Sequence, residues 1–163
     1  MNCKAIQIAP YFIKKEVSPL KLQKLLYYTQ VWFFVKTGNK LFEDKIQAWI
    51  YGPVVYDIWD RFRFMKRSRA IPKDRLQSTE LGEIEAHLDD VWNAYGHLEG
   101  ADLVDLTHSE SPWKNSRKGL LKDEPSGKEV LINSETTSDF VLNDDGTIPK
   151  VTVGETFGHY SNY

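Results

Sequence analysis

The stretch Ser18–Gly38, SPLKLQKLLYYTQVWFFVKTG, carries a long helical pattern and decides the fold. Its apolar residues recur at steps of three and four positions, at Leu22, Leu25, Leu26, Trp32 and Phe33. Ser18 is a good helix cap, Pro19 suits the first helical position, and Gly38 tolerates the left-handed conformation in which helices end. Further aromatic residues lie outside the apolar stripe, namely Tyr27, Tyr28 and Phe34. The pattern therefore predicts a helix that is buried on more than one side.

Shorter helical patterns flank this stretch on both sides. They predict helices over residues 6–13, 53–62, 78–95, 103–106 and 112–116. In the second of these, Gly52 gives the backbone freedom and Pro53 presets the φ angle of the first helical residue. The third is expected to begin near Ser78 and to end at Gly96. Residues 45–51 fit either a strand or a turn of helix.

After Arg117 the helical patterns give way to polar residues and short β-prone runs. Residues 118–127 form a polar loop, residues 130–132 and 140–142 are β-prone, and the run Asp144-Asp145-Gly146 is a turn signal. A last turn of helix is expected near residues 154–160. The predicted fold class is therefore mainly α: a compact single-domain helical bundle of about five to seven helices, with a small β-hairpin near the C-terminus.

The charge of the chain is nearly balanced overall but uneven along the sequence. The 163 residues, 41% hydrophobic and 27% charged, suffice for one domain with a core, and a net charge of -2 argues against a general nucleic-acid coat. Seven basic residues lie between Arg61 and Arg75, whereas Leu76–Trp113 has nine acids and no Lys or Arg. Such polarity steers a charged partner, or it reflects two solvated faces of neighbouring elements.

A cytoplasmic location without membrane contact is the expectation from cysteine usage and hydropathy. Cys3 is the only cysteine, so no intramolecular disulfide forms, which fits a reducing compartment. The N-terminal residues lack the apolar run of a signal peptide. The longest apolar run, Val31–Val35, is too short to cross a bilayer.

Candidate chemistry is sparse. Asp105, His108 and Glu110 suggest a metal site or an acid–base pair, but the zinc deaminases that use His-x-Glu also need a pair of cysteines. The competing interpretation is that His108 closes a helix C-terminus, where a donor satisfies free carbonyls. The chain lacks a nucleophile elbow, a phosphate-binding glycine loop and the HExxH motif. We therefore predict no catalytic residue, no metal ligand and no cofactor.

Three blocks carry a resemblance to a known family. They read LKLQKLLYYTQ (residues 20–30), AWIYGPVVYDIW (48–59) and LTHSESPWKNSR (106–117). In this order and spacing they resemble the Panacea domain, the family of SocA-like antitoxins and phage-associated proteins. The best match is the core 20–117 of a single domain over 1–163, which leaves 118–150 as a variable insert and 151–163 as a closing segment. The residues that carry the signature are Gln23, Lys24, Tyr27, Tyr28, Trp49, Gly52, Pro53, His108, Pro112 and Trp113.

The resemblance implies an antitoxin and not an enzyme. Such a protein would neutralise a toxin, encoded by an adjacent gene, through direct binding. The resemblance to SocA-like members also implies that the protein would act as an adaptor that hands the bound toxin to a protease. The signature residues would then be structural or partner-binding. A second hypothesis is a DNA-binding regulator of a phage or mobile-element operon, with operator DNA held by Arg63, Arg67 and Arg69. A third is a hydrolase or nuclease built on Asp105, His108 and Glu110.

Overall fold

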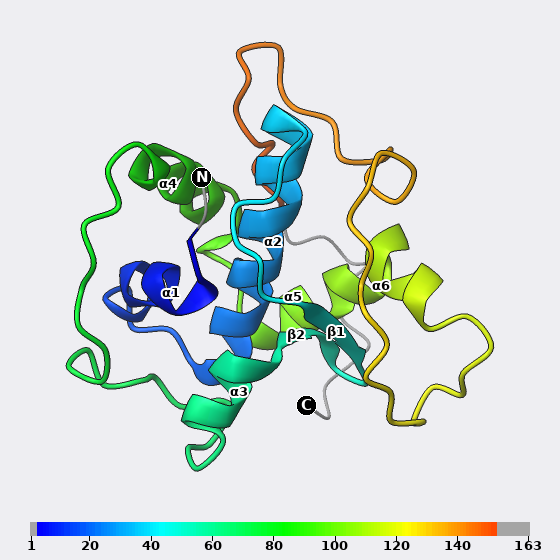
Figure 1. Ribbon diagram of the computed structural model, residues 1–163, viewed down its shortest axis with the longest axis horizontal. Coiled ribbons are helices and arrows are strands. Elements are labelled where there is room, and N and C mark those ends of the chain that lie inside the picture. The colour runs from blue at the N-terminus through cyan, green and yellow to red at the C-terminus, as the bar shows by residue number, and fades with distance from the viewer. Residues whose placement is uncertain (1–2, 153–163) are drawn as a thin grey trace.

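The computed structural model describes residues 3–152, which contain six helices and one two-stranded antiparallel sheet (Figure 1). The prediction of a mainly helical fold with five to seven helices is thus confirmed for the described residues. In chain order the elements are α1 (Ala5–Ile13), α2 (Pro19–Thr37), β1 (Ile46–Trp49), β2 (Gly52–Val55), α3 (Tyr56–Phe62), α4 (Ile84–Tyr95), α5 (Gly100–His108) and α6 (Ser111–Ser116). The last turn of helix expected near residues 154–160 lies outside the described residues.

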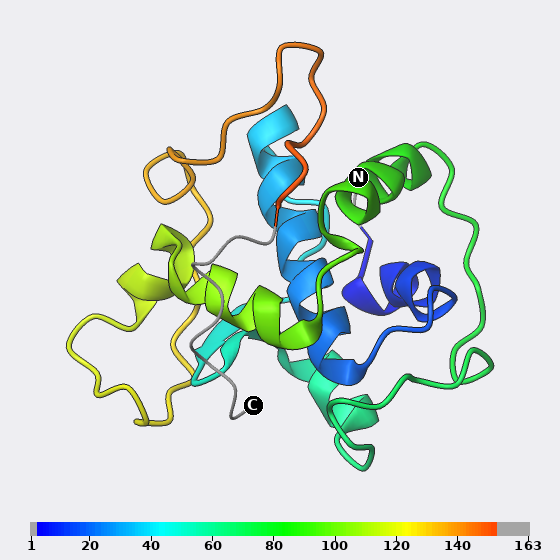
Figure 2. The same ribbon diagram turned by 180° about the vertical axis from the view of Figure 1, so that it is seen from behind.

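Helix α2 is the axis of the fold. Figures 1 and 2 show it in the middle, with α1 and α4 on one side and α5, α6 and the hairpin on the other. Its ends are as predicted, because the Ser18 hydroxyl accepts from the Lys21 amide (3.1 Å) and Gly38 adopts φ +76°. Every residue from Leu22 to Trp32 is buried. The prediction of a helix buried on more than one side is therefore confirmed.

Polar side chains on this buried helix hold irregular backbone in place. The Gln30 amide donates to the Phe42 carbonyl (2.7 Å) and accepts from the Leu41 and Phe42 amides at 2.9 and 3.2 Å. Buried main-chain groups need partners, and residues 38–45 lie outside the helices and strands, with an isolated bridge between Phe42 and Cys3 as their backbone pairing. One glutamine thus fixes the path of the chain between α2 and β1.

The predicted helix over residues 53–62 is wrong in its first part. Residues Gly52–Val55 form β2, which pairs with β1 in the register Ile46↔Val55 to Trp49↔Gly52, and α3 begins only at Tyr56. A Gly-Pro pair resembles a helix start, but Gly52 has φ +111°, and the side chain of Gln23 bonds both backbone groups of Val55. Tertiary contacts thus favour the extended form for the β-branched residues that follow.

Two further boundaries differ from the predictions. Helix α4 begins at Ile84 and not near Ser78, because Gly82 adopts φ +55° and interrupts any earlier helix. Helix α6 begins at Ser111, so Pro112 takes its second position and Glu110 is the capping residue. The predicted end of α4 at Gly96 is confirmed.

The β-hairpin predicted near the C-terminus is wrong, since the hairpin of the structure lies between α2 and α3. The turn at Asp144-Asp145-Gly146 does form, with the Asn143 amide donating to the Thr147 carbonyl (2.9 Å). The β-prone runs beside it dock separately: Val130 donates to the Ile46 carbonyl on β1 (2.7 Å), and the Phe140 ring meets Trp32 edge-on. Each run therefore finds a partner on the helical core, and residues 118–152 contain no ladder of their own.

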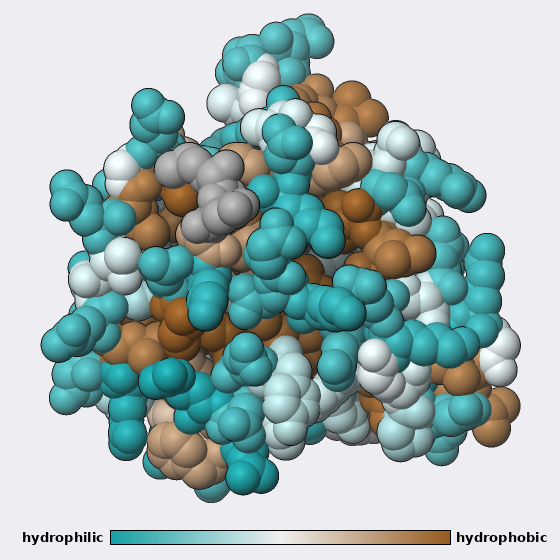
Figure 3. Space-filling model, viewed as in Figure 1, coloured by the Kyte–Doolittle hydropathy of each residue, from teal (hydrophilic) through white to brown (hydrophobic). Residues whose placement is uncertain are grey.

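The face of the molecule shown in Figure 3 is largely polar. On the face in Figure 3, hydrophilic residues cover most of the surface and apolar residues appear between them in separate patches. Residues 3–152 contain no helix with the length and apolar character needed to cross a membrane.

Candidate functional site

The β1–β2 hairpin is anchored to α2 by two residues of the signature. The Gln23 amide donates to the Val55 carbonyl (3.1 Å) and accepts from the Val55 amide (2.8 Å), and the Lys24 amine donates to the Pro53 carbonyl (3.2 Å). Gly52 lies so close that a Cβ atom there would be 2.9 Å from Lys24 Cε and 2.8 Å from Thr107 Oγ1. Close approach as well as positive φ therefore requires glycine at this position.

Helix α6 and the turn after it hold the same hairpin from the other side. The Trp113 indole donates to the Trp49 carbonyl (2.7 Å), and the Arg117 guanidinium donates to the Ala48 carbonyl (2.9 Å). The His108 ring stacks on the Trp113 ring with centroids 4.0 Å apart and planes 18° apart. As expected from the sequence, His108 ends a helix, but its ring also supports the indole that reaches the hairpin.

Burial perturbs the charged groups beneath the hairpin. Lys24 is 0% exposed, and desolvation together with the nearby Arg67 charge lowers its pKa to about 7. Desolvation and the Lys24 charge lower the pKa of His108 to about 4, so the imidazole is neutral at pH 7. The hydrogen bond of His108 to the Ile50 backbone opposes this shift.

Glu110 belongs to a separate buried cluster. Its carboxylate accepts from the Tyr28 hydroxyl (2.9 Å), and the Tyr28 ring stacks on Tyr95 at 4.0 Å. Desolvation raises the pKa of Glu110 to about 8, so that the carboxyl is mainly protonated at neutral pH, and the tyrosine hydroxyls oppose the shift. His108 and Glu110, considered together as catalytic candidates, thus contact different partners.

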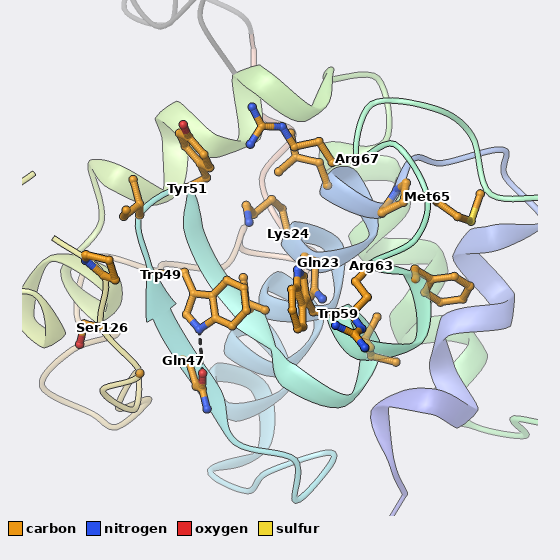
Figure 4. Close-up of a pocket in the computed structure, with 18 residues that line it drawn as sticks. Gln23, Lys24, Gln47, Trp49, Tyr51, Trp59, Arg63, Met65, Arg67 and Ser126 are labelled. Atoms are coloured by element: carbon orange, nitrogen blue, oxygen red, sulfur yellow. Dashed lines mark hydrogen bonds between the residues drawn. The ribbon is translucent and has the colours of Figure 1, made fainter. Parts of the chain in front are cut away.

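The hairpin turn forms one wall of a groove of about 830 Å³ (Figure 4). The Trp49 and Trp59 rings meet at 66° with centroids 5.1 Å apart, and the Trp49 indole donates to the Gln47 side chain (2.7 Å). Val54, Ile58, Phe62 and Met65 add apolar surface. Residues 125–127 also line the groove on the hairpin side, where Gly127 lies close to the Gln47 side chain, so the segment after Arg117 contributes to the groove (Figure 4). This volume is typical of a ligand or peptide pocket.

Two of the three arginines proposed for DNA lie at the rim of this groove. The Arg67 guanidinium lies over the Tyr51 ring, 4.6 Å from its centroid, and Arg63 lies 5.8 Å from the centroid of Trp59. Arg63 also forms an exposed ion pair with Asp60 at 3.2 Å. Arg69 is exposed but does not line the groove.

The structure brings most of the signature residues to one place, around the hairpin. Gln23, Lys24, Gly52 and Pro53 meet on one side of it, and His108 and Trp113 lie on the other. Several contributors were missed, namely Gln30, Tyr51, Trp59, Arg117 and residues 125–127. Tyr51 and Trp59 lie within or beside the second block, so their aromatic character was the available signal. Nothing local marks residues 125–127, which the fold brings there from far along the chain.

Comparison with known proteins identifies the family of the chain. Residues 22–114, more than half of the chain, match the family described as antitoxin SocA-like, Panacea domain. The chain is also similar to Antitoxin SocA of Caulobacter vibrioides (strain NA1000 / CB15N), with 30% identity over 109 residues. That match covers 60% of this chain and 58% of the relative. No solved structure gives a significant match. The matched region contains the hairpin, its α2 anchors and the His108–Trp113 stack, and the chain belongs to the SocA-like antitoxin family with a Panacea domain.

Proposed function

We propose that this protein is a non-catalytic antitoxin that neutralises a partner toxin by direct, non-covalent binding. Family membership supports a toxin as the partner. The observation that carries the proposal is the aromatic groove, because it offers large apolar side chains on a fixed backbone. Tyr51 and Tyr56 are 38% and 46% exposed; Tyr51 lines the groove, and Tyr56 lies beside Trp49 and Trp59. Aromatic side chains with little freedom to lose are favourable anchors in protein interfaces.

The proposal includes a single cytoplasmic domain. The Cys3 thiol donates to the Leu41 carbonyl (3.3 Å), and burial raises its pKa, so that the unreactive thiol form dominates. A protonated, hydrogen-bonded thiol suits a reducing compartment.

Co-expression with the product of the adjacent gene tests this function. We expect the neighbour alone to arrest growth, and co-expression to restore growth and yield a complex that survives two purification steps. An unrelated toxin expressed at the same level is the control, and its effect on growth should persist. If the neighbour is harmless, or if growth is restored without a complex, direct neutralisation is contradicted.

Delivery of the bound toxin to a protease is a separate step of the proposal. It predicts that the half-life of the toxin shortens when the antitoxin is present, and that this effect disappears in a strain without the responsible protease. If growth is restored while the half-life of the toxin stays unchanged, the toxin is neutralised by binding alone and is not delivered to a protease.

The DNA-binding alternative rests on Arg63, Arg67 and Arg69. It predicts binding to upstream DNA that weakens steeply with salt, and loss of binding when the three arginines become alanine. Two of these side chains already lie over aromatic rings at the rim of the groove, which favours a role there.

A further inference from the structure

The groove has a one-sided charge. Of the 18 residues that line it, three are basic, Lys24, Arg63 and Arg67, and none of these described residues is acidic. Lys24 lies below the surface at 0% exposure, whereas the two arginines lie at the rim. An apolar floor edged by guanidinium groups accepts an apolar group that has a carboxylate beside it.

The rim cations are held in position by the groove itself. Arg67 lies over Tyr51 and Arg63 over Trp59, at the distances given above. The Arg67 carbonyl accepts from the Leu20 amide (3.0 Å), which ties the segment after α3 to the start of α2. Because the backbone and the stacking ring both restrain it, the Arg67 guanidinium loses little freedom when it meets a carboxylate.

The hairpin edges favour docking of side chains over addition of a strand. On the outer edge of β1, the Ala48 amide donates to the Lys128 carbonyl (2.8 Å) and the Ile46 carbonyl accepts from the Val130 amide (2.7 Å). On the outer edge of β2, both backbone groups of Val55 bond to Gln23. A partner strand would have to displace these bonds, so the apolar groove is the accessible feature.

We propose that the groove captures a short acidic segment of the toxin, whose large apolar side chains enter between Trp49 and Trp59 and whose carboxylates meet Arg63 and Arg67. The proposal rests on the proposed function and adds to it the chemistry of the recognised segment. Duplex DNA is held mainly by basic side chains that contact its phosphates, whereas here an apolar, aromatic hollow lies between the cations and suits a peptide segment better. Negative charge on the segment is supported by the three basic side chains of the lining, which contains no acid; a carboxylate would meet Arg67 directly and would compete with Asp60 for Arg63.

A peptide titration tests this chemistry without the toxin. The probes are two mixtures of peptides of about 15 residues, with randomised Leu, Phe or Trp at two anchor positions and either Glu or Lys at the flanking positions. Binding to the full chain is measured by fluorescence anisotropy of labelled peptides. We expect the Glu mixture to bind about tenfold or more tightly than the Lys mixture, and Arg67→Glu to remove or reverse this preference. Equal binding of the two mixtures, or no binding of either, would overturn the proposal.

A charge reversal two residues away separates the groove from the basic run in general. Arg69→Glu is the matched control, because Arg69 is exposed in the same segment but does not line the groove. We expect Arg67→Glu to weaken capture of the toxin about tenfold or more and Arg69→Glu to leave it within about twofold. Arg67→Gln and Trp59→Ala should each weaken capture, and circular dichroism identifies any variant that fails to fold. If a short DNA duplex binds and both charge reversals abolish this binding, DNA replaces the acidic segment as the occupant. If the chain forms a dimer that Trp59→Ala dissociates, a second copy of the chain replaces it.

The two proposals fail in distinguishable ways. If the wild-type chain binds the toxin and all groove variants bind equally well, the antitoxin function stands and the groove assignment is overturned. If the wild-type chain binds no toxin but prefers the Glu peptides through Arg67, the groove chemistry stands and direct neutralisation of the neighbouring gene product is contradicted.

Discussion

Replacing Lys24 by methionine isolates the cost of burying one ammonium group. The Lys24 side chain is 0% exposed, and burial lowers its pKa to about 7 from an ordinary value of 10.5. Between these two pH values the unfolded chain holds the proton and the folded chain does not, so the free energy of unfolding rises with pH. Each pH unit inside this window contributes about 1.4 kcal/mol.

The effect is large enough to measure. The contribution of Lys24 to the free energy of unfolding should be about 4 kcal/mol less favourable near pH 6 than near pH 10. Lys24→Met keeps the length of the side chain and removes the charge, so the variant should gain stability relative to the wild type by this amount as the pH falls. Shared groups whose pKa does not depend on Lys24, such as Glu110, cancel in the comparison, and the His108 pKa, which the Lys24 charge lowers, matters only at the acid end of this range.

Urea unfolding followed by tryptophan fluorescence at several pH values gives the difference directly. Lys40→Met is the control, because Lys40 is exposed just after the same helix and its removal relieves no burial. The difference between this control and the wild type should stay flat. A Lys24→Met difference that is constant within about 1 kcal/mol from pH 6 to pH 10 would refute the claim that the folded state holds a desolvated amine.

Three other substitutions test the frame around the hairpin. Gly52→Ala should lower stability in thermal unfolding by about 3 kcal/mol or more. The control Gly146→Ala, at φ +85° with no atom within 4 Å of its Cβ, should lower stability by about 1 kcal/mol. Equal losses would disprove the close approach of Gly52 to Lys24 and Thr107. As the pH falls from about 6.5 to about 4, the free energy of unfolding of the wild type should fall by about 3 kcal/mol more than that of His108→Phe, because the buried imidazole resists protonation. Parallel curves of unfolding free energy against pH for the two proteins would contradict this. Gln30→Leu should cost about 3 kcal/mol in urea unfolding because it leaves buried backbone groups unpaired. The exposed Gln77→Leu should change stability by less than about 0.5 kcal/mol.

Local signals in the sequence predicted α2 and its ends correctly, because periodicity, the Ser18 cap and the Gly38 end act within a few residues of each other. The strand β2 was missed for the opposite reason. Its extended form depends on Gln23, which lies 32 positions away from Val55, and no local rule contains that bond. The sequence predicted a small hairpin in the region of the β-prone runs after Arg117, although each run packs on an element far away in the chain.

The groove could be predicted only in pieces. Trp49 came from the family resemblance, and Arg63 and Arg67 from the charge pattern, but the sequence offered no reason to place them together. The turn that brings them together depends on a glycine with φ +111° and on contacts from three helices and a distant loop. Composition indicated many aromatic residues, and only the fold shows which of them share a surface.

The anchors of the hairpin have a consequence for how this scaffold can diversify. Gln23, Lys24, Trp113 and Arg117 all bond to main-chain atoms of the hairpin. A carbonyl or amide is chemically the same whichever side chain its residue carries, except where proline removes the amide. Residues 49–51 can therefore be exchanged while the backbone stays where it is. Mutation there can change what the groove accepts without breaking the bonds that hold the hairpin backbone, so one frame can serve many binding specificities.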